Sequence, residues 1–295
     1  MASSVERTRG HDNNHGPASV RTVAGARFSF LDNPGPIAFA HRGGAQENPE
    51  NTWNSFSHAR DLGYRYMETD VHATRDGVVV AVHDPGLARV SGRSELARNL
   101  TWQELSSVDL NGGDRIPRLD ELLSAWPETR WNIDAKHDSV VGPLADTLRR
   151  CEAVERVCVT SFSDVRLERM KRLLGPRLCT AMGPAAVAAL RLASLSPWAT
   201  VAFSRPVLLP FRRFGAVQVP TRYRNVELVE RRLVATAHAA GLQVHVWTID
   251  DEAEMDRVLD LGVDGIMTDR PTLLKAVLER RGQWHGLAGN GARRA

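Results

Sequence analysis

The chain has 295 residues, of which 42% are hydrophobic and 25% are charged, and its formal net charge is +3. These values are ordinary for a soluble globular protein, and the length allows one large core. The arginines are scattered, without the aromatic-interleaved basic face of nucleic-acid binders, and no apolar run approaches the roughly 20 residues of a membrane span.

The N-terminus and the cysteines indicate a compartment. The opening residues, MASSVERTRGHDNNHGPAS, contain no apolar stretch of the kind that a secretory signal peptide needs. The three cysteines, Cys151, Cys158 and Cys179, lack metal-ligand spacing, and the last two fall in apolar runs as small core residues. We therefore expect a reducing, cytoplasmic location.

Composition divides the chain into three parts. Residues 1–30 are rich in Ser, Asn, Gly and Arg and predict a disordered leader, whereas residues 282–295 hold four glycines and predict a flexible tail. Residues 31–281 alternate short β-rich runs with helical patterns, which is typical of parallel βα units in a single domain.

The predicted elements follow one another regularly. Strands are predicted at residues 37–40, 66–72, 131–136, 157–161, 178–182, 216–219, 244–249 and 265–268. Helices are predicted at residues 52–62, 119–125, 141–151, 163–174, 226–240, 252–261 and 271–280. Eight such strands are the number that closes an α/β TIM (β/α)8 barrel.

One arm interrupts this alternation after the second strand. Asp76-Gly77 lies between two β-rich runs, so residues 78–83 are expected to fold back on the second strand as a β-hairpin. Residues 85–118 then form an insertion, in which Thr101 and Glu104 have the spacing of a capping box at a helix start.

Acidic residues gather on two of the predicted strands. Glu68 and Asp70 occupy alternate positions of one strand and so share a face, as does His72, to which we assign no role. Inward carboxylates repel one another and are costly to ionise, and a divalent cation would resolve this. Asp134 would supply a third ligand, and Lys136 could hold a phosphate oxygen. The alternatives are exposed acids on the first strand and a plain Asp134–Lys136 ion pair on the second.

Two histidines follow apolar strands and precede turns. His41 stands before Gly43-Gly44, and His83 before Asp84-Pro85-Gly86. At a barrel mouth, one imidazole could remove a proton from a hydroxyl while the other protonates a leaving alkoxide. Arg42, next to the first histidine, offers a bidentate fork suited to phosphate.

Other residues near these motifs have a structural interpretation, and two of them also have a functional one. The segment 48–52 caps the following helix, and its Glu50 could in addition approach a metal. Trp247 ends a strand and could bind substrate as an apolar wall at the mouth, or pack in the core. Asp269 belongs to a turn that bounds the last strand, and we expect a structural role for it.

These motifs together resemble the glycerophosphodiester phosphodiesterase family. The resemblance rests on HRGGAQENPENTWNSF, YMETDVHATRDGVVVAVHD, LTWQELSSVDLNGGDRIPRLDELL, WNIDAK, VTSFS, VHVWTID and GVDGIMTDRP, and spans about residues 36–278. It implies a TIM barrel that hydrolyses glycerophosphodiesters to sn-glycerol 3-phosphate and an alcohol. Family members use Mg²⁺ or Ca²⁺, and a cyclic phosphate formed by the glycerol 2-hydroxyl is often proposed for them.

The resemblance also implies roles for individual residues. His41 and His83 would be the acid–base pair. The metal ligands would be Glu68, Asp70 and Asp134, and the phosphate would be held by Arg42 and Lys136. One departure concerns the third ligand, because Asp134 stands where the family usually has the longer glutamate. That difference bears on metal preference and on coordination through water.

Two rival functions stay open at this point. Lysophospholipase D-like cleavage of lysophospholipids would use the apolar, arginine-rich segment 198–214 as an acyl-chain site or a peripheral membrane contact, although the same segment could be a buried helix and loop. A catalytically silent lipid-headgroup binding module would require the loss of a histidine or a metal acid, and the sequence retains both kinds. The leaving alcohol, the metal, the oligomeric state and the order of the two histidines are not given by the sequence.

Overall fold

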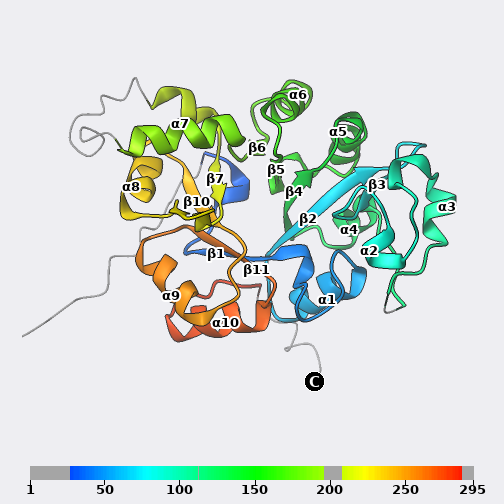
Figure 1. Ribbon diagram of the computed structural model, residues 1–295, viewed down its shortest axis with the longest axis horizontal. Coiled ribbons are helices and arrows are strands. Elements are labelled where there is room, and N and C mark those ends of the chain that lie inside the picture. Colours follow the sequence, from blue (N-terminus) through cyan, green and yellow to red (C-terminus); the bar gives the residue numbers. More distant parts are fainter. Residues whose placement is uncertain (1–26, 112, 196–207, 288–295) are drawn as a thin grey trace, which may run out of the picture.

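The computed structural model describes residues 27–111, 113–195 and 208–287. Eight parallel strands form a central ring, which Figure 1 shows surrounded by helices. They are β1 (Ile37–Ala40), β2 (Tyr66–Ala73), β4 (Arg130–Ala135), β5 (Val157–Thr160), β6 (Cys179–Thr180), β7 (Ala216–Val219), β10 (Gln243–Val246) and β11 (Gly265–Thr268). Their order is β6-β5-β4-β2-β1-β11-β10-β7.

The ring closes between its two end strands. A parallel bridge joins Ala181 to Ala216, and the amide of Met182 donates to the Ala216 carbonyl at 2.9 Å. On the other side of the bridge, the amide of Gly215 donates to the Thr180 carbonyl at 2.9 Å. The predicted TIM barrel is therefore confirmed, with β6 as its shortest strand.

The outer layer consists of helices that follow the strands along the chain. They are α1 (Trp53–Asp61), α4 (Leu119–Ala125), α5 (Val141–Arg150), α6 (Asp164–Leu174), α7 (Pro184–Leu195), α8 (Arg231–Ala239), α9 (Glu252–Asp260) and α10 (Pro271–Arg280). Helix α1 shows why they start where they do, since Thr52 accepts from the Ser55 amide while Ser55 Oγ accepts from the Thr52 amide. Apolar faces such as Leu144, Ala145 and Leu148 of α5 pack against the strands.

An aromatic plug fills the N-terminal end of the barrel. Phe30, in the short 3-10 helix Ser29–Leu31, packs edge-on against Tyr66 with ring centroids 5.4 Å apart, and Phe39 completes the cluster. Tyr66 Oη donates to the Phe30 carbonyl at 3.0 Å. Phe28 is also buried, so residues 27–30, which we assigned to the leader, belong to the fold, and residues 1–26 lie outside the described part of the chain.

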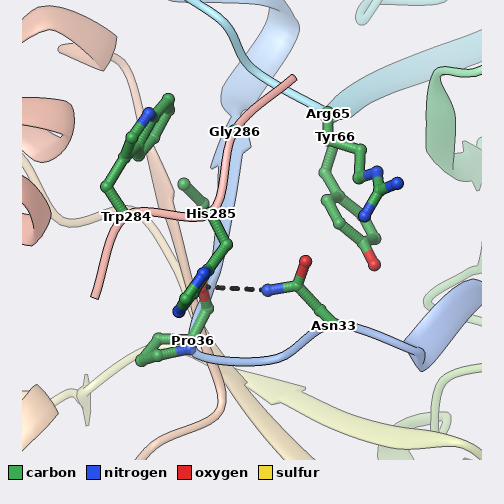
Figure 2. A pocket seen from close by; sticks show the side chains of 8 residues that line it. Asn33, Pro36, Arg65, Tyr66, Trp284, His285 and Gly286 are labelled. Carbon is green, nitrogen blue, oxygen red and sulfur yellow. Dashed lines mark hydrogen bonds between the residues drawn. The ribbon is translucent and has the colours of Figure 1, made fainter. Parts of the chain in front are cut away.

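Residues 282–287 of the predicted tail also belong to the fold, and residues 288–295 lie outside the described part of the chain. Trp284 packs on Tyr64 with centroids 5.1 Å apart, and the Leu287 amide donates to the Gly63 carbonyl at 2.8 Å. Next to this contact lies a small pocket, lined among others by Asn33, Tyr66, Trp284 and His285, and shown in Figure 2. Its free space of about 10 Å³ is room for a single water molecule.

The hairpin and the insertion lie beside β2. Strand β3 (Val79–Ala81) pairs with β2 in antiparallel fashion, as Asp76-Gly77 predicted. The insertion carries α2 (Ala88–Ser91) and α3 (Trp102–Ser106), and its Leu87, Leu105 and Ile116 form an apolar cluster with Val80 and Val82 of the hairpin arm. The predicted capping box is confirmed, because the Thr101 amide donates to Glu104 at 2.7 Å and Thr101 Oγ1 accepts from the Glu104 amide at 3.3 Å.

Two elements differ from the prediction. The helix expected at 226–240 starts only at Arg231, because β8 (Arg222–Tyr223) and β9 (Val226–Glu227) form a small hairpin before it. Helix α7 was not predicted, since its alanine-rich sequence has no clear apolar stripe and leaves Leu192 exposed. Of the segment 198–214, residues 198–207 lie outside the described part of the chain, whereas Leu208 and Phe214 are buried. Within the described residues, no helix has the length and apolarity to cross a bilayer.

Candidate active site at the barrel mouth

The acidic residues lie inside the barrel near its C-terminal end. In the parallel register of β2 and β4, Asp70 lies beside Asp134, and Glu68 lies beside Asn132. Glu68, Asp70 and Asp134 are only 5%, 1% and 6% exposed. The alternative of exposed acids on β2 is therefore wrong, and the shared inward face is confirmed.

Lys136 lies between two of these carboxylates. Its Nζ is 2.7 Å from Asp70 Oδ1 and 2.7 Å from Asp134 Oδ2, so the ion pair that we considered as an alternative does form. Burial would raise the pKa of Asp70, but the charges of Lys136 and Arg42 outweigh burial and lower that pKa. Burial raises the pKa of Asp134, and Lys136 offsets this only in part. Asp134 Oδ1 is buried and has no hydrogen-bond partner among the residues that the structure describes.

Arg42 reaches the acids from the loop after β1. Its φ of 51° is left-handed, and Gly43 and Gly44 follow with φ of 82° and 104°, so the chain turns sharply at the strand end. This turn directs the Arg42 amide to Glu68 Oε2 at 3.1 Å and places Nε 3.0 Å from Asp70 Oδ2, although without hydrogen-bond geometry. Arg42 Nη1 donates to Glu50 at 3.2 Å.

Glu68 is the least compensated of the acids. Burial, together with the charge of Asp70, raises the pKa of Glu68 to about 7. Its Oε2 lies 3.7 Å from His41 Nε2. Burial would lower the pKa of His41, but the charge of Glu68 and the hydrogen bond to Asp269 outweigh it and raise that pKa. The His41 ring and the Glu68 carboxyl group thus raise or lower each other's pKa across this short distance.

Each histidine has its own carboxylate partner. His41 Nδ1 lies 2.7 Å from Asp269 Oδ1, and His83 Nδ1 lies 2.7 Å from Asp84 Oδ1. An ionised carboxylate only accepts hydrogen bonds, so both Nδ1 atoms carry protons and both Nε2 atoms are left for proton transfer. The Val82 amide donates to the Asp70 carbonyl at 2.9 Å, which sets His83 just beyond the acids of β2.

Several of these partners were missed in the sequence. Asp269 and Asp84 were assigned to turns, and the only signal for them is their position directly after a strand. Asn51 was given only a capping role, yet it accepts from Thr69 Oγ1 at 2.8 Å and donates to Asp70 Oδ2 at 3.1 Å. Glu50, which we considered as a metal neighbour, pairs with Arg42 and with an arginine of the insertion.

Trp247 follows β10 and is partly exposed. It lies edge-on to Phe162, which follows β5, with ring centroids 6.1 Å apart. Phe162 is 69% exposed, so the pair offers aromatic surface beyond the ends of the strands. His72, for which we predicted no role, lies 3.3 Å from the His83 carbonyl through its Nε2.

The acids suit a divalent cation in their chemistry, but they are not assembled around one. Within the described ranges, no three His, Cys, Asp or Glu residues are grouped as metal donors. Lys136 takes one oxygen of Asp134 and one of Asp70. The orphaned Asp134 Oδ1 and the raised pKa of Glu68 nevertheless mark unsatisfied negative charge of the kind that oxygen-binding cations neutralise. Glu68, Asp70 and Asp134 thus fit a metal site, and their role as ligands stays a prediction.

Comparison with known proteins identifies the family of the chain. The glycerophosphoryl diester phosphodiesterase family matches residues 41–273. The probable glycerophosphodiester phosphodiesterase 2 of Mycobacterium tuberculosis is 42% identical over 258 residues, which cover 87% of this chain and 96% of that protein. The lysophospholipase D GDPD1 of Homo sapiens is 29% identical over 281 residues, with 81% and 85% covered.

Solved structures share the fold. A putative glycerophosphoryl diester phosphodiesterase from Silicibacter pomeroyi has a TM-score of 0.70 at 24% identity, with 88% of this chain and 100% of that chain covered. A phosphodiesterase from Oleispira antarctica, solved in complex with the product sn-glycerol-3-phosphate, has a TM-score of 0.66 at 20% identity, with 83% and 97% covered. Since the family match extends over most of the sequence, the chain belongs to the glycerophosphoryl diester phosphodiesterase family.

Proposed function

We propose that the protein hydrolyses glycerophosphodiesters to sn-glycerol 3-phosphate and an alcohol by histidine acid–base catalysis. The observation that carries this proposal is the pair of imidazoles, each held through Nδ1 by a carboxylate at 2.7 Å and each next to the buried acids of β2. The names of the relatives support the same substrate class, as does the product bound in the Oleispira antarctica phosphodiesterase.

The two imidazoles divide the proton transfers. One Nε2 removes a proton from the glycerol 2-hydroxyl that attacks phosphorus, and the other donates a proton to the departing alkoxide, which leaves a cyclic phosphate. Water then opens this ring with the two proton transfers reversed, and sn-glycerol 3-phosphate is formed. Each such role typically contributes about 10²–10⁴ in rate. Asp269 and Asp84 keep the rings of His41 and His83 in the tautomer that leaves Nε2 available.

The cationic side chains bind the phosphate in this proposal. Arg42 and Lys136 are held against carboxylates, so they are already oriented before substrate arrives and lose little side-chain entropy on binding. Glu68, Asp70 and Asp134 would hold one Mg²⁺ or Ca²⁺. When bound, such an ion supplies neutralisation of the phosphoryl charge. Trp247 would contact the substrate with its ring.

The test is a panel of glycerophosphodiesters, such as glycerophosphocholine and glycerophosphoethanolamine, assayed for glycerol 3-phosphate release with chelator and with Mg²⁺ or Ca²⁺ restored. We expect release that depends on the added cation and that falls at least a hundredfold in His41→Ala and in His83→Ala. Full metal-dependent turnover by either variant would contradict the acid–base pair. Equal turnover in chelator would contradict the metal site.

The same variants can assign the two roles. A substrate with a p-nitrophenol leaving group needs no proton on the departing oxygen. The variant whose loss is much smaller with this substrate than with glycerophosphocholine therefore lacks the general acid. If both variants lose the same factor on both substrates, neither histidine protonates the leaving group.

Lysophospholipase D-like cleavage is the second candidate function. Relatives from Homo sapiens and Mus musculus that bear this name are 29% and 30% identical. The exposed Phe162 beside Trp247 could contact an acyl chain at the mouth. The KM values for a lysophospholipid and for its deacylated counterpart distinguish the two candidate functions, because an acyl-chain site lowers KM only for the lipid. A peripheral membrane contact through 198–214 stays a prediction, which vesicle binding would test.

A further inference from the structure

Arg89 joins two carboxylates that belong to different loops. It lies in α2, at the start of the insertion. Its Nη1 and Nη2 donate to the two oxygens of Glu50 at 2.8 and 2.7 Å, and its Nε donates to Asp84 Oδ2 at 2.6 Å. The carbonyl of Arg89 accepts from the Asn111 side chain at 3.1 Å, which helps to fix α2 within the insertion.

Both carboxylates lead directly to residues of the site. Glu50 binds Arg42 on its other side, with Nη1 at 3.2 and 3.3 Å from its two oxygens. Asp84 binds His83 Nδ1 with its other oxygen at 2.7 Å. A continuous chain of charged contacts therefore runs from Arg42 through Arg89 to His83.

The side chains of Glu50 and His83 border open space and are not enclosed by packed apolar residues on every side. A small recess with about 10 Å³ of free space lies between the loop after β1 and the hairpin arm, lined by Glu50, His83 and apolar residues of the insertion such as Val90 and Ile116. The insertion shares its apolar cluster with Val80 and Val82 of the hairpin arm. Toward the loop after β1, the described residues of the insertion add an exposed hydrogen bond from Asn54 to Asp114 at 3.0 Å.

An ordinary surface ion pair would have no such consequence, since exposed pairs contribute little to stability and often hold no fixed geometry. Arg89 differs from such a pair because its fork is bidentate and its third N–H is also used. The side chain of Glu50 is only 15% exposed, although that of Arg89 is 48% exposed. Arg93, in the same insertion, supplies the contrast, because it pairs only with its near neighbour Glu95.

We propose that Arg89 is a positioning residue for the reaction, which sets the His83 ring through Asp84 and the Arg42 guanidinium through Glu50. The inference rests on the proposed phosphodiesterase activity. It predicts two separable effects, since a displaced His83 lowers kcat whereas a displaced Arg42, as a phosphate contact, raises KM. Displacements of about 1 Å at a distance from the chemistry can cost about 10²-fold in rate.

The experiment compares Arg89→Ala, Arg89→Lys and the matched control Arg93→Ala in the full chain, with glycerophosphocholine as substrate. We expect Arg89→Ala to lose about tenfold to a hundredfold in kcat and to raise KM severalfold. Arg89→Lys should recover only part of the loss, because an ammonium cannot reproduce three planar contacts. Arg93→Ala should stay within twofold of the wild type, with unchanged thermal unfolding in all variants.

Chemical rescue separates positioning from a general structural defect. Arg89 is half exposed, so millimolar guanidinium can enter the vacated space in Arg89→Ala and restore at least fivefold in kcat, whereas equal NaCl should not. Asp84→Asn should reproduce mainly the kcat loss, and Glu50→Gln mainly the KM rise. Values of kcat and KM for Arg89→Ala within twofold of the wild type would overturn the proposal, as would an equal loss in Arg93→Ala.

A readout without activity keeps this inference apart from the proposed function. Crystal structures of the wild type and of Arg89→Ala should show the Glu50 or the Asp84 carboxylate moved from its partner in the variant. If both carboxylates keep their distances to Arg42 and His83, Arg89 does not position them. If the wild type releases no glycerol 3-phosphate from any glycerophosphodiester, the proposed function fails, and the crystallographic comparison still decides the role of Arg89.

Discussion

The raised pKa of Glu68 should make the free energy of unfolding depend on pH. Its carboxyl group is buried next to Asp70, and its pKa rises to about 7 from an ordinary value of 4.5. An acid with a raised pKa in the folded state favours folding most at low pH, where it is protonated in both states. This contribution is lost as the pH rises from about 4.5 through 7, because the unfolded chain ionises first. We therefore expect Glu68→Gln to become relatively more stable than the wild type with rising pH.

The size of the effect follows from the same displacement. A pKa that moves from 4.5 to about 7 corresponds to about 3 kcal/mol in the free energy of unfolding between low pH and pH 8. His41 acts with the same sign, because its pKa is also raised and its stabilisation is lost as the pH rises through that pKa. Removing Glu68 removes a main cause of the raised pKa of His41, so the variant should depend less on pH for both reasons.

The assay is urea unfolding at several pH values between 5 and 8 in the presence of chelator. Glu128→Gln, at a glutamate whose side chain is 68% exposed, is the matched control and should follow the wild type. A difference between Glu68→Gln and the wild type that stays constant across this range would refute the reasoning. Adding Mg²⁺ or Ca²⁺ should flatten the wild-type curve, because a bound cation favours the ionised carboxylate, and should act less on the variant.

Three further substitutions test the fold and the site. Asp269→Asn removes one cause of the raised pKa of His41, and it removes the carboxylate that keeps the proton on Nδ1 of that ring. We therefore expect kcat to fall about tenfold or more. An unchanged kcat would exclude the orienting role of Asp269. Trp131→Ala empties a fully buried site and should cost about 3–5 kcal/mol in urea unfolding, and a loss below 1 kcal/mol would contradict tight packing there. Gly43→Ala forces a Cβ to 2.3 Å from Ser55 Oγ at a φ of 82°, so both stability and kcat should fall; wild-type values would show that the turn can relax.

The barrel strands could be predicted because strands that are buried on both faces consist almost entirely of apolar residues. Ile37–Ala40 and Gly265–Thr268 are short apolar runs bounded by turn residues, and parallel barrel strands covered on both faces take this form. The hairpin Arg222–Glu227 lacks that signature, since its exposed residues include Arg, Tyr and Val without a buried face. This hairpin forms because its two short strands pair with each other at the barrel mouth. The sequence that follows has the apolar spacing of a helix, so the prediction extended that helix over the hairpin.

The site divides in the same way between local and distant information. Alternate positions on one strand placed Glu68 and Asp70 on one face, and the same rule applies to Asp134 and Lys136. The partner of His41 could not be found by such a rule, because Asp269 lies 228 residues away in the chain. Position after a strand tells where a side chain lies on the ring, but only the closed barrel tells which side chain it meets.

The charges at the mouth favour binding of a metal cation even though the side chains of Arg42 and Lys136 already lie among the acids. Three buried carboxylates lie near only two permanent positive charges, those of Arg42 and Lys136. Arg42 also forms an ion pair with Glu50. Asp70 is thereby satisfied and its pKa is lowered, whereas the pKa of both other acids is raised. A phosphodiester brings one more negative charge into this low-dielectric site, and binding it would draw Arg42 and Lys136 away from the acids. The excess negative charge then grows, so we predict that the stabilisation by an added divalent ion is larger with substrate present than without it.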